Sequence, residues 1–436
     1  MSTPYEPYLL TADGTADFGA LRRYEERGGW AAARRAVTEM TPAEVIGLVK
    51  AAGLRGRGGA GFPAGVKWGF VPPPDRVPGP RYLVVNADES EPGTFKDQAL
   101  LETDPHLTLE GAVIAAYAIG AETIYIYIRG EMPAEARILQ EAIHEAYGAG
   151  HLGAGLYDTA TRMDVTVHRG AGAYICGEET ALLTSLEGGR GYPRIKPPFP
   201  AFSGLFGQPT IINNVETLAN VPAIVNRGVA WFRSMGTEQS PGGKIFSLSG
   251  HLKRPGNYEA PLGIGLLTLL HDPRYGAGPW QERPFKAVIP GGSSVPVLRA
   301  DELDVRMDFE SLQAAGTMLG SGGVIAMDES VDMVEVLYNL ARFYHHESCG
   351  QCTPCREGTG WTARILRRFH ENRGREEDLA LLLDIADQMM GKTICPLADA
   401  LAMPVKSHVT KFPDEFRRHM GGEIPRYVPP SSWAVG

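Results

Sequence analysis

Four of the five cysteines lie close together near the end of the chain. Cys349, Cys352 and Cys355 form a C-x2-C-x2-C triplet in ESCGQCTPCREG, and Cys395 follows in TICPLAD. A loop with a thiolate at every third residue can surround three corners of a cubane, and a distant thiolate then completes the ligation of a [4Fe–4S] cluster. Structural zinc also takes four cysteines, but more often as two C-x2-C pairs. The spacing therefore favours the iron–sulfur cluster over zinc.

The fifth cysteine, Cys176, stands alone in AYICGEE. A lone cysteine is more often a small buried hydrophobe than a nucleophile, and no neighbouring His or Asp pattern argues otherwise. The N-terminal sequence MSTPYEPYLLTADG has neither the basic nor the apolar segment of a secretory signal. We therefore expect a buried Cys176 and no disulfide framework.

A glycine-rich stretch, LRGRGGAGFPAG, places Gly56, Gly58 and Gly61 at G-x-G-x-x-G spacing. The ordinary dinucleotide fingerprint follows a strand and opens a helix. This stretch instead follows TPAEVIGLVKAAG, which has the pattern of a capped helix. Its glycines still allow the backbone to lie flat against a flat ligand, with Phe62 adjacent for stacking and Lys67 nearby for a phosphate.

Two further loops, NADESEPGTFKD and HRGAGAYICGEET, carry carboxylates. Carboxylates repel phosphate but accept hydrogen bonds from ribose hydroxyls and ring N–H groups. Glu178 and Glu179 also fall in the first turn of an expected helix, where capping acids are ordinary. The number of acidic groups favours a binding role. The candidates in these loops are Asn86, Asp88, Glu89, Glu91, Gly177, Glu178 and Glu179.

A third candidate stretch, TIINNVETLANV, offers Asn213, Asn214 and Thr217 near the start of a helix. Their neutral donors and acceptors suit a phosphate or a sugar. A simple helix cap explains them equally well.

These loops must be positioned by alternating strands and helices. Such alternation predicts right-handed βαβ crossovers and a parallel sheet, here a doubly wound α/β fold with helices on both faces. Ligands of such sheets bind outside the carboxyl ends of the strands, where the acidic loops begin. The expected strands are 82–87, 123–128 and 163–168, and the expected helices are 106–120, 132–150 and 177–188.

The 436-residue chain predicts several domains. We expect an N-terminal helical region at 1–50, the α/β domain at 51–238, a small α+β domain at 239–329, and helices with the cysteines and an irregular tail at 330–436. The formal charge of −9 argues against broad nucleic-acid binding. With no apolar run of about 18 residues, a soluble, cytoplasmic chain is expected, and any membrane association would come through partners.

Seven motifs occur in an order and at spacings that resemble the NADH-binding flavoprotein subunits of respiratory complex I. They are RGRGGAGFP, NADESEPGTFKD, HRGAGAYICGEETAL, KPPFPA, NNVETLANV, ESCGQCTPCREG and CPLAD. The resemblance covers roughly residues 40 to 420. It implies a Rossmann-like FMN/NADH domain, a ubiquitin-like β-grasp (SLBB) domain and a helical bundle that carries a [4Fe–4S] cluster.

The resemblance also implies roles for individual residues. FMN would be surrounded by Gly56, Arg57, Gly58, Lys67, Asn86, Asp88, Glu89, Gly177, Glu178, Glu179, Asn213, Asn214 and Thr217. NADH would contact Phe62, Phe70, Glu91, Lys196 and Phe199, and also Glu178 and Glu179, whose charges would disfavour the 2′-phosphate of NADPH. The cluster ligands would be Cys349, Cys352, Cys355 and Cys395.

The implied reaction is hydride transfer from NADH to FMN, followed by single-electron transfer to the cluster and onward to partner Fe–S subunits and quinone. Cofactors of this kind supply the chemistry themselves, so no catalytic base is expected. The implied partners are a thioredoxin-like [2Fe–2S] subunit and a large Fe–S subunit of the peripheral arm. The chain would then be cytoplasmic and peripheral to the inner (plasma) membrane through the complex.

Two alternatives stay open. The same module serves as the diaphorase subunit of NAD-linked hydrogenases and formate dehydrogenases, often with extra cysteine-bearing domains. No cysteine precedes Cys176 or follows Cys395, which favours complex I without excluding a stand-alone formate dehydrogenase subunit. The other alternative is a zinc-stabilised scaffold with a vestigial nucleotide fold, which would be colourless when purified.

Overall fold

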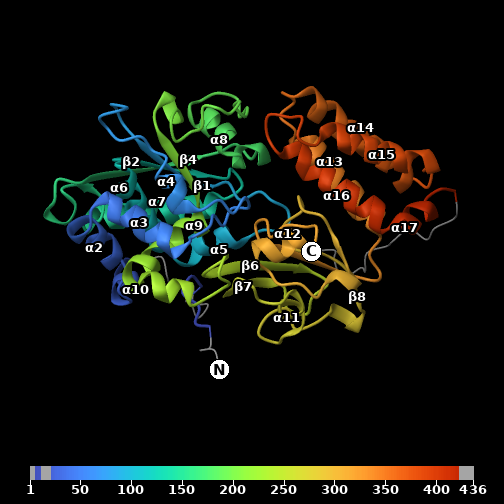
Figure 1. The fold of residues 1–436 in the computed structure, drawn as a ribbon, viewed down its shortest axis with the longest axis horizontal. Coiled ribbons are helices and arrows are strands. Elements are labelled where there is room, and N and C mark those ends of the chain that lie inside the picture. Colours follow the sequence, from blue (N-terminus) through green and yellow to red (C-terminus); the bar gives the residue numbers. More distant parts are fainter. Residues whose placement is uncertain (1–4, 11–20, 422–436) are drawn as a thin grey trace. The chain divides into compact units, whose positions relative to one another are not determined.

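The computed structural model describes residues 5–10 and 21–421, which form two compact units (Figure 1). The first unit extends to Glu329 and the second begins at Ser330. The irregular tail expected at the C-terminus lies, after Gly421, outside the described residues.

The first unit contains a five-stranded sheet with the order β3-β4-β2-β1-β5. Strands β1, β2, β4 and β5 run parallel, and the two-residue β3 pairs antiparallel to β4 at one edge. The parallel α/β fold expected from the alternation of strands and helices is confirmed. The strands are β1 (Tyr82–Ala87), β2 (Thr123–Ile128), β3 (Gly153–Ala154), β4 (Arg162–Arg169) and β5 (Thr210–Asn214).

One strand of this sheet, β5, was not predicted, because TIINN is short and shows no alternation of apolar and polar residues. Its first four residues are buried, and its backbone pairs with β1 in the register Tyr82↔Thr210 to Asn86↔Asn214. Pairing with a distant strand therefore decides its conformation. The register also places the backbones of Asn86 and Asn214 side by side at the carboxyl edge of the sheet.

The helices around this sheet follow local signals. Helix α3 begins with a capping box in which the Thr41 N–H donates to Glu44 (2.7 Å) and the Glu44 N–H donates to Thr41 Oγ1 (3.3 Å), and it ends at Gly53 (φ 71°). The helices are α1 (Leu21–Glu26), α2 (Ala31–Glu39), α3 (Pro42–Ala52), α4 (Ala64–Trp68), α5 (Lys96–Thr103), α6 (Pro105–Ile119), α7 (Pro133–Gly148), α8 (Glu179–Leu186), α9 (Val215–Ala219) and α10 (Val221–Arg233).

A second sheet in the same unit has the order β7-β6-β10-β8-β9. Strands β6 and β7 form an antiparallel hairpin, whereas β6 and β10 are parallel. Its core includes Phe246, Leu248, Val288 and Val324. The elements are β6 (Gly243–Gly250), β7 (Gly256–Pro261), α11 (Leu266–His271), β8 (Phe285–Ile289), β9 (Leu298–Arg299), α12 (Phe309–Ala314) and β10 (Gly323–Asp328).

The second unit, orange to red in Figure 1, consists of helices. Its first helix packs through one apolar face, because Val334, Leu337, Ala341 and Tyr344 are all buried. Among the described residues, no helix of either unit is both long and apolar enough to cross a membrane. The helices are α13 (Met333–Glu347), α14 (Thr353–His370), α15 (Glu376–Met389), α16 (Leu397–Lys411) and α17 (Pro413–Arg418).

Candidate functional site

Two asparagines hold the strand-end loops together at the carboxyl edge of the first sheet. The Asn86 amide donates to the Gly177 carbonyl (2.8 Å) and accepts from the Asp88 N–H (3.1 Å), so it joins the loops that follow β1 and β4. Asn214 caps α9 through the Glu216 N–H (3.1 Å). The structure thus brings together three stretches that the sequence singled out separately.

The glycine-rich loop lies against this edge. The Arg57 N–H donates to Thr217 Oγ1 (2.8 Å), and a Cβ added at Gly58 would lie 3.0 Å from the Asn214 Cβ. Gly56 closes the loop by donating to the Phe62 carbonyl (2.9 Å). A side chain at position 58 would therefore be crowded against Asn214, which favours glycine here, and the contact of this loop with a flat ligand stays a prediction.

Arg57 reaches this edge through its backbone only. Its side chain is fully buried and donates to the Pro241 carbonyl (3.0 Å). Its contact with FMN stays a prediction, one that the geometry supports for the main chain rather than for the guanidinium.

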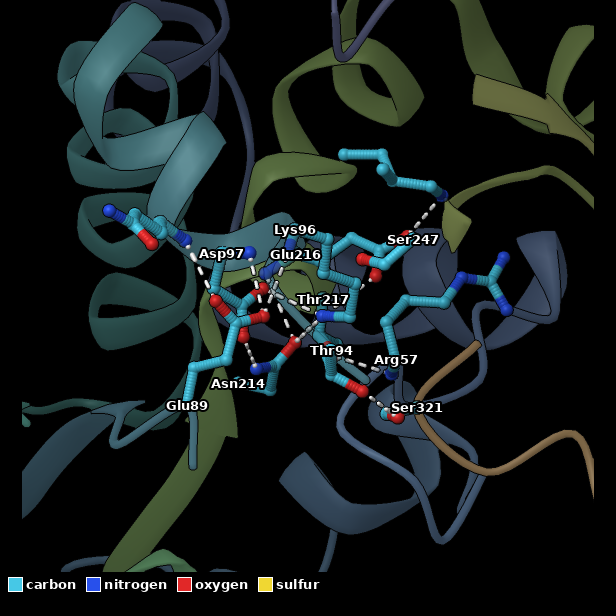
Figure 2. Close-up of polar contacts among 12 residues, drawn as sticks. Arg57, Glu89, Thr94, Lys96, Asp97, Asn214, Glu216, Thr217, Ser247 and Ser321 are labelled. Carbon is cyan, nitrogen blue, oxygen red and sulfur yellow. Dashed lines mark hydrogen bonds and ion pairs between the residues drawn. The ribbon is translucent and has the colours of Figure 1, made fainter. Parts of the chain in front are cut away.

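A buried ionic network contacts the Asn214 side chain (Figure 2). The Glu216 carboxylate forms ion pairs with the ammonium groups of Lys96 (2.9 Å) and Lys244 (3.1 Å). All three side chains are almost fully inaccessible to solvent. Lys96 also pairs with Asp97 (2.7 Å), whose other oxygen accepts from the Asn214 amide (2.5 Å). The network therefore fixes the orientation of the Asn214 side chain.

The charges of the network compensate one another. Burial would raise the pKa of Glu216, but Lys244, Lys96 and Arg57 outweigh burial and lower it. Burial lowers the pKa of Lys244 to about 8, although Glu216 opposes the shift. Removing one member would leave an opposite charge buried and only partly paired, which is strongly destabilising.

Glu89 faces a helix rather than the strand edge. Its carboxylate accepts the N–H groups of Lys96 (2.9 Å), Asp97 (2.9 Å) and Gln98 (3.0 Å) at the start of α5. Burial raises its pKa to about 7, with Asp97 adding to the shift. Neighbouring Asp88 is also buried. Ligand contacts of Glu89 and Asp88 stay predictions.

The two glutamates of the GEET motif have different main contacts. Glu178 caps α8 by accepting the N–H groups of Thr180 (2.8 Å) and Ala181 (3.0 Å), as the capping interpretation expected. Glu179 lies between Lys67 (2.9 Å) and Lys196 (2.7 Å). Burial would raise the pKa of Glu179, but the two ammonium groups lower it to about 2. Glu179 therefore stays anionic throughout the physiological pH range.

Three aromatic side chains are exposed where stacking was expected. Phe62 and Phe70 are 48% and 44% exposed, and their ring centroids lie 6.0 Å apart. Phe199, on the same loop as Lys196, is 53% exposed. Exposed rings of this size are typical of surfaces that bind planar ligands.

Glu91 joins the loop after β1 to the second sheet. Its carboxylate accepts the Tyr174 hydroxyl (2.7 Å) and the Ser294 N–H (2.7 Å). Burial raises its pKa, and these hydrogen bonds oppose the rise. Glu91 is thus held within hydrogen-bond distance of two elements that lie far apart in the sequence.

Sequence reasoning did not identify Lys96, Glu216, Lys244 or Tyr174. One signal was available, because Lys244 directly precedes the apolar residues Ile245 and Phe246, and the structure buries every residue of β6 from Gly243 to Leu248. A lysine at such a position is almost always paired. Its partner could not be read from the local sequence.

The second unit brings the cysteine triplet and Cys395 together. The Ile394 N–H donates to Cys352 Sγ (3.3 Å), so the loop before Cys395 lies against the triplet. Cys355 and Cys395 are buried, and Cys349 and Cys352 are partly buried. Across residues 5–10 and 21–421, no three His, Cys, Asp or Glu side chains are arranged to hold a single metal ion.

These residues fit a [4Fe–4S] cluster. The donor set consists of four sulfurs, which is the usual ligation of such a cluster. Cys352 is the N-cap of α14, and the positive end of an 18-residue helix favours thiolates and the negative charge of a cluster. Cys176, by contrast, is buried in the first unit, as expected.

Two family models match the chain. The Nuo51 FMN-binding domain matches residues 49–223, and the NADH-ubiquinone oxidoreductase-F iron–sulfur binding region matches residues 335–419. The first range contains the strand-end loops of the first sheet, and the second contains all four clustered cysteines. The chain therefore carries an FMN-binding domain and a [4Fe–4S]-binding region, and the zinc alternative is not supported.

Two bacterial F subunits are similar in sequence to this chain over nearly its whole length. It is 52% identical to the second F subunit of the NADH-quinone oxidoreductase of Rhizobium meliloti, covering 95% of this chain and 98% of the relative. It is 51% identical to the F subunit of the NADH-quinone oxidoreductase of Mycobacterium tuberculosis, covering 92% and 90%.

A solved NAD⁺-reducing [NiFe]-hydrogenase in the H2-reduced state aligns with a TM-score of 0.82 at 36% identity; the alignment covers 92% of this chain but only 66% of the hydrogenase chain. The fold, the two matched regions and these relatives agree. The chain belongs to the family of NADH-quinone oxidoreductase F subunits, the NADH-oxidising flavoprotein modules of complex I and related enzymes.

Proposed function

We propose that the carboxyl edge of the first sheet holds FMN and NADH, and that this chain is the NADH-oxidising entry point of a quinone-reducing complex. The observation that carries the proposal is the convergence of Asn86, Asn214 and the Gly58 loop on one sheet edge, within the matched FMN-binding region. When bound, FMN supplies the hydride-accepting chemistry and the cluster supplies the single-electron outlet.

The residues of this edge suit a flavin nucleotide. Gly58 lets the backbone approach a ring system, and the neutral amides of Asn86, Asn213 and Asn214 can recognise ring or ribitol groups without charge. Lys67, which pairs with Glu179 (2.9 Å), would contribute a positive charge for the phosphate. The side-chain Oδ1 of Asn213 accepts the Trp68 indole N–H (2.8 Å), which leaves the NH2 group of the same amide available to a ligand.

We infer the NADH contacts from the exposed aromatic rings and from the ion pair of Glu179 and Lys196. Phe62, Phe70 and Phe199 offer stacking faces for planar rings. Glu179 can accept ribose hydroxyls and repels a 2′-phosphate, and Lys196 holds Glu179 in place. The protein thereby aligns the nicotinamide with the flavin, and no protein base has to take a proton.

We propose the remaining organisation from the same resemblance. The second sheet and its helices, residues 239–329, would be the β-grasp (SLBB) domain, and Cys349, Cys352, Cys355 and Cys395 would ligate the cluster. The chain acts within an NADH-quinone oxidoreductase complex, and its direct partners would be a thioredoxin-like [2Fe–2S] subunit and a large Fe–S subunit. Through them it would lie at the cytoplasmic face of the inner membrane.

The hydrogenase alignment supports a second host, an NAD-linked hydrogenase. The lower identity of 36%, against 52% for the quinone oxidoreductase relative, favours the quinone-reducing complex. The subunits that co-purify with the native chain distinguish these hosts.

The site assignment is tested with Asn214→Ala. We expect the purified variant to lose most of its FMN and its NADH:ferricyanide reductase activity, because Asn214 joins the buried network to the N-cap of α9 at the end of β5, beside the glycine-rich loop. Asn226→Ala, on the exposed face of α10, is the matched control and should keep both. Full flavin content in Asn214→Ala would contradict the assignment.

A further inference from the structure

We propose that Ser348 is a positioning residue that acts through Cys355 and raises the reduction potential of the cluster. The inference rests on the proposed ligand set and concerns a side chain that is not itself a ligand. Ser348 follows the last turn of α13, where its N–H donates to the Tyr344 carbonyl (3.0 Å). Its hydroxyl oxygen lies 3.2 Å from Cys355 Sγ.

The direction of this hydrogen bond follows from the charge state of a ligating cysteine. The Ser348 oxygen accepts the Gly350 N–H (3.3 Å), which helps to hold the hydroxyl in place and leaves its hydrogen to donate. A ligating cysteine is a thiolate and has no hydrogen to give. The Ser348 hydroxyl hydrogen is therefore the donor, and the Cys355 sulfur is the acceptor.

Another proposed ligand receives a hydrogen bond from the backbone. The Ile394 N–H donates to Cys352 Sγ (3.3 Å), and no side-chain substitution removes that donor. The Ser348 hydroxyl can be removed by mutation, because it belongs to a side chain. Ser348 is also only partly buried, so its truncation leaves little unfilled space.

The effect on the cluster follows from charge. Reduction adds an electron to the cluster and its thiolates, so a donor hydrogen bond to sulfur stabilises the reduced form more than the oxidised form. Hydrogen bonds to the sulfurs are among the factors that set the potentials of Fe–S clusters. Ser348 therefore makes the cluster a better acceptor for electrons that leave the flavin.

Thr393 provides a matched control. Its hydroxyl also lies beside a proposed ligand, but it donates to the Cys395 carbonyl oxygen (2.8 Å) rather than to a sulfur. The Thr393→Ala substitution removes a hydroxyl near a proposed ligand but no hydrogen bond to a sulfur. This substitution should leave the reduction potential of the cluster unchanged.

The experiment is a redox titration of the full-length holoprotein, followed by EPR of the reduced cluster, with iron and sulfide measured on each sample. Ser348→Ala should shift the reduction equilibrium about threefold to tenfold toward the oxidised cluster, which is a lowering of up to about 59 mV for a one-electron couple. Ser348→Thr, which retains the hydroxyl, and Thr393→Ala should titrate like the wild type.

Three results would overturn the proposal. They are an unchanged potential in Ser348→Ala at full iron content, an equal shift in Thr393→Ala, and a Ser348→Ala protein that assembles no cluster while Ser348→Thr does, since the hydroxyl would then serve assembly. A wild-type protein without iron or an EPR signal would instead contradict the proposed function itself.

Discussion

Lys244 of strand β6 forms a fully buried ion pair with Glu216 of α9, with the ammonium nitrogen 3.1 Å from the carboxylate oxygen. The same ammonium donates to the Arg57 carbonyl (3.4 Å), and Glu216 also accepts the Ile245 N–H (2.8 Å). This ion pair thus connects the second sheet both to the glycine-rich loop and to α9, the helix that Asn214 caps. The carboxyl edge of the first sheet, where we propose that FMN binds, is therefore connected to a residue that lies outside that sheet.

Replacing Lys244 by Met should destabilise the first unit by about 3 kcal/mol or more, because Glu216 loses one of its two buried partners. Urea unfolding followed by circular dichroism measures the change, and FMN content should fall with it. Lys253→Met, at an exposed pair with Glu282, is the control and should unfold like the wild type. Equal stability of Lys244→Met and the wild type would show that the pair is dispensable.

Gly58→Val should lower the FMN content of the purified protein, because a Cβ at this position lies 3.0 Å from the Asn214 Cβ and pushes the loop away from the strand edge. FMN per chain is measured by absorbance after acid release. Gly47→Val on the exposed face of α3, where a Cβ meets no atom within 4 Å, controls for loss of a glycine. A Gly58→Val protein with full flavin would count against the role of the loop.

Glu179→Gln should weaken the preference for NADH over NADPH by about tenfold, because the variant removes the carboxylate that repels the 2′-phosphate. The ratio of kcat/KM for the two nucleotides is the measurement. Glu141→Gln, on the exposed surface of α7, should leave the ratio unchanged. An unchanged ratio in Glu179→Gln would exclude a role for this residue in nucleotide choice.

The helical unit should lose stability as the pH rises above the usual histidine pKa of about 6.5. His419 contacts Asp332 (2.8 Å) and the Phe369 carbonyl (3.0 Å), and although burial opposes the shift, Asp332 raises the pKa of His419 above its usual value. A raised pKa means that this stabilisation is fully present below about pH 6.5 and is lost as the pH rises through the folded-state pKa.

Hydrogen exchange of the amides in α13, measured at pH 6 and pH 8, tests this dependence. After correction for the intrinsic effect of pH, protection should fall between the two values in the wild type. In His419→Gln the protection should be the same at both values, because Gln does not titrate. An equal fall in the variant would place the pH dependence elsewhere.

Local chemistry was readable from the sequence where one segment contains all the participants. The capping box of Thr41 and Glu44, the apolar segments that form β1, β2 and β4, and the spacing of the cysteine triplet are such cases. Strand β5 and the contacts of Glu216 were not readable, because their partners lie far away in the chain. The fingerprint in the glycine-rich loop would have misled by itself, since it follows a helix. The Asn86↔Asn214 register explains how these loops come together at one edge.

Anaerobic titration of the purified full-length protein with NADH, followed by visible absorbance and low-temperature EPR, tests the central claim most directly. The account predicts about one FMN and about four iron atoms per chain. It also predicts bleaching of the flavin absorbance by NADH and the appearance of a reduced-cluster signal. A colourless protein, or one whose flavin and iron spectra do not change on addition of NADH, would contradict it.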